Sequence, residues 1–344
     1  MAGEAASAFD PETLVAAQSL ASDDAWQTYG WHYPPSFHLL IAPLGLLGFS
    51  AAFAVFSVCA IGVYVWALRR VTSSIPGGFG LAVAAPLVVF VLITGNARLL
   101  WAAAFLFSLS FVLQGRPRPG GAMIALMTLK PQLGLSIPVA LVAARQWRLL
   151  LWSVVLTAAI ILLTVAAFEL DCWARFFEAM GATTELYRLH GQNAVTMVTW
   201  YAFSRQAGAG HDAAIAVQLC SLAISAGIVA LLVVPRRGVA IDLKIAALCL
   251  ATLTATPYVF QYELVLEVLG ALFLARAGTG ASLAGRFWLC VLWLLPVPGW
   301  LIGDLAIAQY AAPVLSLSLL LYAVQALRPP AMRPSIATSG RKGL

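Results

Sequence analysis

Charged residues are scarce in this sequence. Only 10% of its 344 residues are Asp, Glu, Lys or Arg, whereas 62% are hydrophobic. Soluble globular domains carry about a quarter charged residues, so this composition excludes a soluble domain for most of the chain. Several apolar runs are long enough to cross a bilayer as helices, which takes about 20 residues each. We therefore expect an all-α, polytopic membrane protein.

Cysteine is also scarce, and no two cysteines have the spacing of metal ligands. No P-loop, dinucleotide-binding loop or nucleophile elbow occurs either. We therefore expect no disulfide framework, no metal site and no cofactor. The cysteines, four of which lie inside apolar runs, are expected to be small core residues: Cys59, Cys172, Cys220, Cys249 and Cys290.

The first 35 residues contain no Lys or Arg, which excludes a signal peptide with a basic start. The formal net charge of +6 comes from arginines at the ends of apolar runs, a placement that indicates membrane topology and not nucleic-acid binding. If these arginines face the cytoplasm, residues 1–48 lie outside and the tail 328–344 lies inside. We expect a multi-pass protein of the cell membrane, in a bacterium its inner membrane.

The apolar runs predict about nine membrane-spanning helices within residues 49–327. They are expected near 49–68, 79–95, 98–114, 149–168, 213–235, 241–257, 259–275, 287–303 and 306–327. The segment 119–146 is too short for two spans, so it predicts a re-entrant hairpin with Lys130 and Gln132 at its tip. Polar residues gather on the outer side, in 1–48 and in 169–211, and 191–207 predicts an interfacial helix there.

The stretch "TYGWHYPPSFHLLIAPLGLL", residues 28–47, holds His32 and Tyr33 beside two prolines just before the first span. Prolines fix the direction in which the chain enters the membrane. The two aromatic residues could form a wall of an outward-facing cavity. They could equally belong to the aromatic belt that membrane proteins place at the interface.

Lys130 is the most informative charge, because a cation within the hydrocarbon costs about 3 kcal/mol and often marks a substrate or ion site. A lysine ammonium suits a phosphate group, and the half-helix after Pro131 would add its dipole. The alternative is that the side chain extends to the interface.

The turn "TATPYVFQYELVLE", residues 254–267, offers a second set of polar side chains at the outer end of two spans. Glu263 is a candidate catalytic base or sugar ligand, or else a charge that stabilises a helix N-terminus. Cavity or acceptor contacts are expected from Tyr258, Gln261, Tyr262, His190, Gln192 and Asn193. An ordinary helix cap is the alternative for the last three, which lie in "LHGQNAV".

Four segments together resemble glycosyltransferase family 87: "FDPETLVAAQ", "YGWHYPPSFHLLIAPLGLL", "GGAMIALMTLKPQLGLSIPVALVAARQWR" and "TATPYVFQYELVL". These are polyprenyl-phosphate-mannose-dependent α-1,2-mannosyltransferases of the GT-C superfamily. The resemblance implies a GT-C-like bundle that transfers a hexose, mannose by analogy, with inversion, from a polyprenyl-phosphate sugar to a glycolipid or glycan acceptor on the outer face. It implies that Lys130 and Arg98 hold the donor phosphate and that the lipid tail lies between spans.

The resemblance also implies a catalytic aspartate after a first transmembrane helix, upstream of the family's "YDP" segment. Phe9-Asp10-Pro11 matches that segment, so the aspartate and helix are expected before Met1, and this chain is expected to be inactive or nearly so. Otherwise Glu263 or Asp10 would have to replace it. The family's "GQN" appears here as Thr94-Gly95-Asn96, which puts donor contacts in doubt.

A hypothesis from another class is a transporter or flippase for a lipid-linked sugar or small solute. Broken half-helices and a lysine at membrane depth also suit transporters. The absence of a recognisable inverted repeat and the gathering of polar residues on one side favour the transferase.

Overall fold

The computed structural model describes residues 2–19, 30–72, 78–190, 197–235, 238–295, 297 and 308–327. Throughout these ranges the regular elements are helices, and the extended pairing is a single antiparallel bridge between Met197 and Phe260. The chain divides into two compact units, which we describe separately. Unit 1 comprises Met1–Ser73, Phe90–Gly134 and Trp147–Ala194, and unit 2 comprises Ser74–Val89, Leu135–Gln146 and Val195–Leu344.

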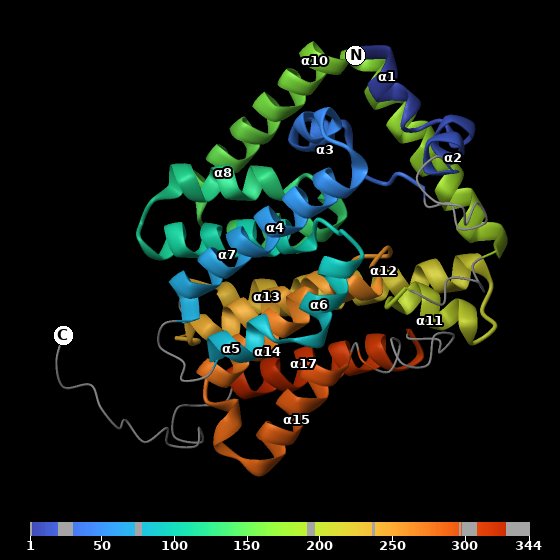
Figure 1. Cartoon of the computed structure of the whole chain (residues 1–344). Helices are drawn as coiled ribbons and strands as arrows, with labels where there is room; N and C mark the ends of the chain where they lie inside the picture. Colours follow the sequence, from blue (N-terminus) through green and yellow to red (C-terminus); the bar gives the residue numbers. More distant parts are fainter. Residues whose placement is uncertain are drawn as a thin grey trace. The chain divides into compact units, whose positions relative to one another are not determined.

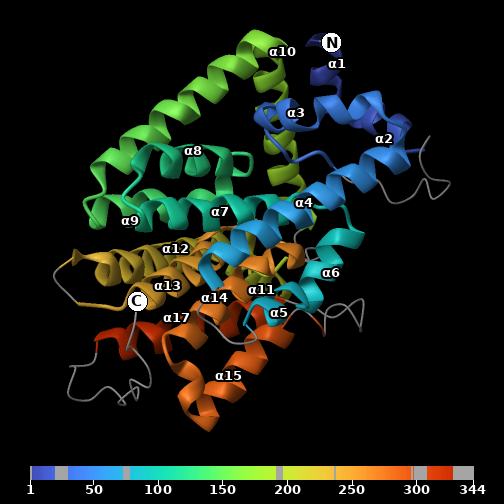
Figure 2. The same ribbon diagram turned by 60° about the vertical axis from the view of Figure 1, so that its left-hand side comes forward.

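Unit 1 is a layer of four long helices with a short N-terminal segment. Helix α4 packs on α7, α7 on α8, and α8 on α10 (Figures 1 and 2). The elements are α1 (Ala2–Ser7), α2 (Pro11–Ser19), α3 (Pro35–Ile41), η1 (Ala42–Leu46), α4 (Phe49–Thr72), α7 (Arg98–Leu113), α8 (Pro117–Met127), η2 (Pro131–Gly134) and α10 (Trp147–His190).

Two glycines allow α8 and α10 to approach closely. A Cβ on Gly121 would lie 2.6 Å from Cβ of Trp152 and 2.9 Å from the backbone nitrogen of Ser153. A Cβ on Gly120 would lie 3.1 Å from a methyl group of Leu149. Small residues are common where membrane helices meet, because they let backbones come together.

Helix α10 bends sharply at Glu169, where φ is 65° and ψ is 167° (Figure 1). The part before the bend agrees with the predicted span 149–168. The part after it is helical to His190, so much of the predicted outer segment 169–211 continues α10. Helix α1 packs on this second part, where Phe9, Cys172 and Phe176 form a buried cluster.

Unit 2 is built around α13 (Ile241–Ala255), which packs against α12 (His211–Val233), α14 (Val265–Arg276) and α17 (Ala308–Leu327). Gln218 and Ser221 of α12 both donate hydrogen bonds to the carbonyl of Thr254, at 3.1 and 2.8 Å, near the end of α13. The other elements of unit 2 are α5 (Gly78–Val83), α9 (Ser136–Ala143), α11 (Trp200–Gln206), η5 (Gln261–Leu264), η6 (Thr279–Ala281) and α15 (Leu283–Leu294). Helix α6 (Pro86–Ile93) contributes residues to both units.

Three described helices are long and apolar enough to cross a membrane: Phe49–Thr72, Trp147–Leu189 and His211–Val233. They identify a membrane protein, but the predicted total of nine spans is not confirmed, because the remaining apolar helices in the described ranges are shorter. The predicted span 79–95 is likewise not confirmed. Two short helices, α5 and α6, cover it, because Pro86 lacks the N–H group that would continue the first.

The predicted hairpin 119–146 consists of α8, η2 and α9, and its membrane placement stays a prediction. The interfacial helix predicted over 191–207 corresponds in part to α11, with Thr199 as its N-cap. Residues 191–196 and the tail 328–344 lie outside the described residues. Of the predicted span 287–303, the structure describes residues 287–295 and 297.

Candidate functional site

The site begins with the α7–α8 hairpin of unit 1. The two helices are joined by the short turn Gln114–Arg116, so the start of α7 and the end of α8 lie at the same, open end. The carbonyl of Met127 accepts hydrogen bonds from the backbone nitrogen of Lys130, at 3.1 Å, and from Nε1 of Trp101, at 2.9 Å. This junction brings Arg98, the first residue of α7, toward Lys130.

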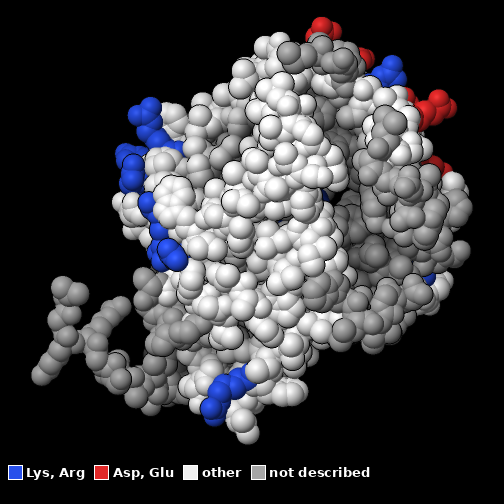
Figure 3. Space-filling model, in the orientation of Figure 1, with Lys and Arg blue, Asp and Glu red and all other residues white. Residues whose placement is uncertain are grey.

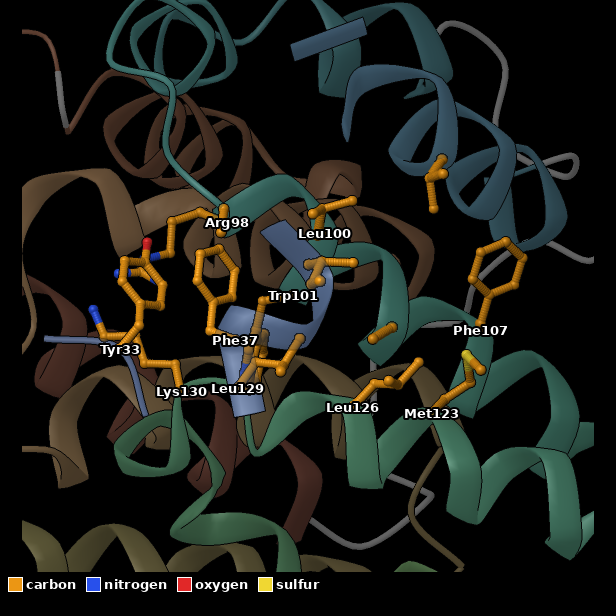
Figure 4. A pocket seen from close by; sticks show the side chains of 14 residues that line it. Tyr33, Phe37, Arg98, Leu100, Trp101, Phe107, Met123, Leu126, Leu129 and Lys130 are labelled. Carbon is orange, nitrogen blue, oxygen red and sulfur yellow. The ribbon is translucent and has the colours of Figure 1, made fainter. Parts of the chain in front are cut away.

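A cavity of about 280 Å³ opens at this end of the hairpin. Arg98 and Lys130 line it and are themselves buried, with 2% and 4% of their surfaces exposed (Figure 4). The rest of the lining is almost wholly apolar: Phe37, Leu40, Val63, Ala97, Leu100, Trp101, Ala104, Phe107, Met123, Leu126 and Leu129, with the ring of Tyr33. The cavity therefore has a polar end, formed by Arg98 and Lys130, and a long apolar wall, and both belong to unit 1.

Tyr33 forms a wall of this cavity beside Arg98. The Arg98 guanidinium lies 5.5 Å from the centroid of the Tyr33 ring, and that ring stacks on Phe37 at 4.1 Å. A cation over an aromatic face is attracted by the ring quadrupole. Pro34 occupies the N-cap position of α3 and Pro35 is its first residue, so two fixed φ angles set the direction of the chain directly after Tyr33.

The turn before α7 contributes through Asn96. Its side-chain Oδ1 lies 3.4 Å from the Tyr33 hydroxyl, which donates to it. Gly95 has φ of 62°, a conformation that favours glycine, and a Cβ there would lie 2.7 Å from the Phe53 ring. The departure from the "GQN" pattern at this position therefore has a local physical reason.

The electrostatic field of the site is positive. The charge of Arg98 acts on Lys130, and the charge of Lys130 acts in turn on His32. Burial, reinforced by the Lys130 charge, lowers the pKa of His32 below its ordinary value, although a backbone hydrogen bond at Gly30 opposes this. Two basic side chains therefore lie where an anion such as phosphate would be stabilised, and a bound anion would in turn favour the charged form of Lys130.

His32 and Gln132, both predicted to contact ligand, do not line this cavity. His32 Nε2 lies 3.5 Å from the hydroxyl of Thr183 on α10. Gln132 is half-buried in η2. Their predicted contacts with ligand remain predictions.

The other predicted site residues belong to unit 2 or to the end of α10. Glu263 is fully buried in η5, and its Oε2 accepts a hydrogen bond of 2.7 Å from the backbone nitrogen of Phe260. Tyr262 stacks on Phe260 with centroids 5.5 Å apart, and Tyr258 and Gln261 are half-buried nearby in the chain. His190 ends α10, and Gln192 and Asn193 lie outside the described residues.

Sequence reasoning missed several polar side chains and cavity residues. Trp101 could have been found, because it lies one helical turn after Arg98 and so shares its face. Glu267 of α14 is fully buried, and neither of its carboxylate oxygens is hydrogen-bonded within the described ranges. The Tyr201 hydroxyl lies 3.0 Å from Nδ1 of His211, a pairing across α11 and α12 that no sequence pattern indicates. Over the described residues, no group of three or more His, Cys, Asp or Glu side chains could hold a metal ion.

Comparison with known proteins gives a match to a family. The model of glycosyltransferase family 87 matches residues 31–259, which is more than half of the chain. No curated protein and no solved structure matches. The matched range contains Tyr33, Arg98 and Lys130, whereas Glu263 lies just beyond it.

Proposed function

Because the chain belongs to glycosyltransferase family 87, a family of membrane glycosyltransferases, we propose that it transfers a hexose from a polyprenyl-phosphate sugar to a hydroxyl of a glycolipid or glycan. The observation that carries this proposal is the pairing of buried Arg98 and Lys130 in one otherwise apolar cavity. A polyprenyl-phosphate sugar has the same division, with one anionic phosphate and a long hydrocarbon tail.

The donor phosphate is assigned to the polar end of the cavity. An arginine guanidinium binds phosphate oxygens in pairs, and a lysine ammonium adds a compact charge. The Arg98 guanidinium lies against the Tyr33 ring, and the backbone nitrogen of Lys130 is bonded to the Met127 carbonyl. The tail would follow the apolar wall toward Phe107, between α4 and the α7–α8 hairpin.

The chemistry follows from this placement. The acceptor oxygen attacks the anomeric carbon, the bond from that carbon to the phosphate oxygen breaks, and its electron pair leaves with the phosphate. The two cations stabilise the charge that develops on the leaving group. A single displacement of this kind inverts the anomeric configuration, and the acceptor proton passes to a carboxylate base.

Glu263 stays the sequence-based candidate for this base; it belongs to unit 2 and does not line the cavity. Asp10, the other candidate, does not line the cavity either, and it is exposed and caps α2. Hydrogen bonds from the side chain and backbone of Thr13 lower the pKa of Asp10, which weakens it as a base. The acceptor and the reaction belong on the outer face in this proposal, with the carboxyl terminus inside.

Donor binding is the direct test. The full chain in lipid nanodiscs would be titrated with farnesyl-phosphate mannose and, separately, farnesyl-phosphate glucose. Replacing Lys130 by Met removes a charged hydrogen-bond donor, so the affinity is expected to fall at least about tenfold. Lys244→Met removes the same charge from α13, outside the cavity, and is expected to leave the affinity unchanged.

Transfer is measured separately from binding. Product formed from a β-linked donor should carry an α linkage, as shown by nuclear magnetic resonance of the new glycoside. Glu263→Gln tests the candidate base: it removes the carboxylate but retains an oxygen that can accept the Phe260 hydrogen bond. If Glu263 is the base, transfer is lost while donor binding persists. Equal donor affinity in the wild type and the Lys130→Met variant would overturn the donor site.

A further inference from the structure

A second positive surface lies at the other end of the unit 1 helices, away from Arg98 and Lys130. We define the arginine surface as Arg70 at the end of α4, Arg116 and Arg118 at the start of α8, and Arg148 at the start of α10. All four are exposed, and no described carboxylate forms a salt bridge with any of them. Figure 3 shows basic side chains gathered along the edge over these helix ends.

Aromatic rings hold these arginines in a connected row. Arg70 lies over Trp66 at 5.2 Å and over Phe107 at 5.7 Å. Phe107 stacks on Phe111 at 6.5 Å, and Arg116 lies over Phe111 at 5.2 Å. The row is therefore a built surface across α4, α7 and the start of α8.

The row continues onto α10. Arg118 lies over the Trp152 ring at 4.5 Å, and Trp152 is one helical turn from Arg148. The close contact at Gly121 fixes α8 against Trp152, so Arg118 and Arg148 share this end of the unit. Stacked guanidinium groups are pre-organised and lose less freedom when they bind an anion.

The length of α10 places the arginine surface at a membrane interface. From Arg148 to Glu169 the helix rises about 30 Å, which equals the thickness of a bilayer core. The described acidic residues of unit 1 lie in the N-terminal segment or in α10 from Glu169 onward: Glu4 of α1, Asp10 just before α2, Glu12 of α2, and Glu169, Asp171, Glu178 and Glu185 of α10. None of these belongs to the helix ends that carry the arginine surface.

Two helix N-termini reinforce the positive potential. Both α8, of 11 residues, and α10 begin at this surface, and a helix N-terminus carries a partial positive charge. Exposed Trp66 and Trp147 stand at the same ends of α4 and α10. Tryptophan and arginine at one depth suit the headgroup layer of a bilayer.

We propose that the arginine surface binds the phosphate headgroups of anionic glycerophospholipids in the leaflet that it faces. The acyl chains of these lipids lie along the apolar faces of α4 and α10, and their phosphates lie against Arg116, Arg118 and Arg148. The headgroup site is distinct from the polar end of the donor cavity at Arg98 and Lys130, although the ring of Phe107 borders both. The proposal does not depend on which sugar the protein transfers.

Native mass spectrometry of the full chain in detergent tests the site. The protein is titrated with dioleoyl-phosphatidylglycerol and with dioleoyl-phosphatidylcholine. Each arginine near an anionic headgroup strengthens binding about fivefold, so Arg116→Gln with Arg118→Gln should weaken phosphatidylglycerol binding about 25-fold. Phosphatidylcholine binding should not change.

The matched control is the pair Arg175→Gln with Arg286→Gln, which removes two exposed arginines outside the arginine surface. It should leave phosphatidylglycerol binding within about twofold of wild type. Equal losses of phosphatidylglycerol binding in both double variants would show that binding depends on net charge alone, which would overturn the site. Millimolar inorganic phosphate that displaces the lipid would overturn its assignment to a lipid. Thermal unfolding of both double variants is the control that they are folded.

Discussion

Nε1 of Trp101 donates a hydrogen bond of 2.9 Å to the carbonyl of Met127, the same carbonyl that accepts from the backbone nitrogen of Lys130. This side chain therefore links the start of α7 to the residue that carries the second cation of the cavity. Its effect on the position of Lys130 can be measured apart from its effect on folding.

Replacing Trp101 by Phe removes the hydrogen bond and keeps an aromatic ring in the cavity wall. A net hydrogen bond contributes about 1 kcal/mol, so donor affinity should fall about fivefold. Trp173→Phe is the control, because it removes an indole hydrogen bond to Thr164 within α10, away from the cavity. Unchanged donor affinity in Trp101→Phe would show that the bond does not position Lys130.

Adding a methyl group at Gly121 should separate α8 from α10. The new Cβ would meet the Trp152 side chain and the Ser153 backbone at less than 3 Å, and backbone atoms cannot move aside cheaply. We expect Gly121→Ala to lower the free energy of unfolding by about 1 to 3 kcal/mol. Gly181→Ala, in an open part of α10, should be neutral or stabilising by up to about 1 kcal/mol, since alanine favours helix. Thermal unfolding in detergent compares the two, and equal midpoints would contradict the close contact.

The bend in α10 places Glu169 in a backbone conformation that only glycine adopts without strain. Glu169→Gly should therefore raise the free energy of unfolding by about 1 kcal/mol, whereas Glu169→Ala should not. Both variants lose the same charge, so their difference isolates the backbone. A lower thermal midpoint for Glu169→Gly than for Glu169→Ala would show that the bend is not strained.

Acid should destabilise unit 1 through His32. Burial lowers the folded-state pKa of His32 below its ordinary value, so the unfolded chain binds a proton more readily than the folded chain. Stability from this residue is fully present above pH about 6.5 and falls as the pH drops toward the lowered pKa. The loss of thermal stability between pH 7.5 and 5.5 should be smaller in His32→Gln than in the wild type. An equal loss in both proteins would show that His32 does not titrate on unfolding.

The sequence predicted the helical class, the first span and the early part of α10, because these depend on runs of apolar residues that carry their own signal. Helix α4 extends to Thr72, and α10 begins near the predicted residue. The segment 79–95 was predicted as one continuous helix because hydropathy alone does not register the helix break at Pro86. The bend at Glu169 was equally invisible, since no glycine or proline marks it.

The part of the site that the sequence predicted is the pair of basic residues at the open end of the α7–α8 hairpin. Arg98 and Lys130 line the same cavity, as the family resemblance implied, although their role in binding phosphate is still a prediction. His32 could not be placed from sequence, because the contact with Thr183 depends on how α10 continues beyond its bend. The sequence also does not show which side chains lie near Tyr258 and Glu263 in space, so it does not decide their roles.

The α7–α8 hairpin carries both cations of the cavity, and the bond that fixes one of them, within the single segment 98–130. A recombination event that exchanged the rest of the gene but kept this segment would transmit the pair with its spacing intact. Selection for a different acceptor can then change residues elsewhere in the chain while the two residues assigned to the donor phosphate keep their spacing. Divergence among descendants of such a gene should accordingly be uneven, with the hairpin as its slowest-changing part.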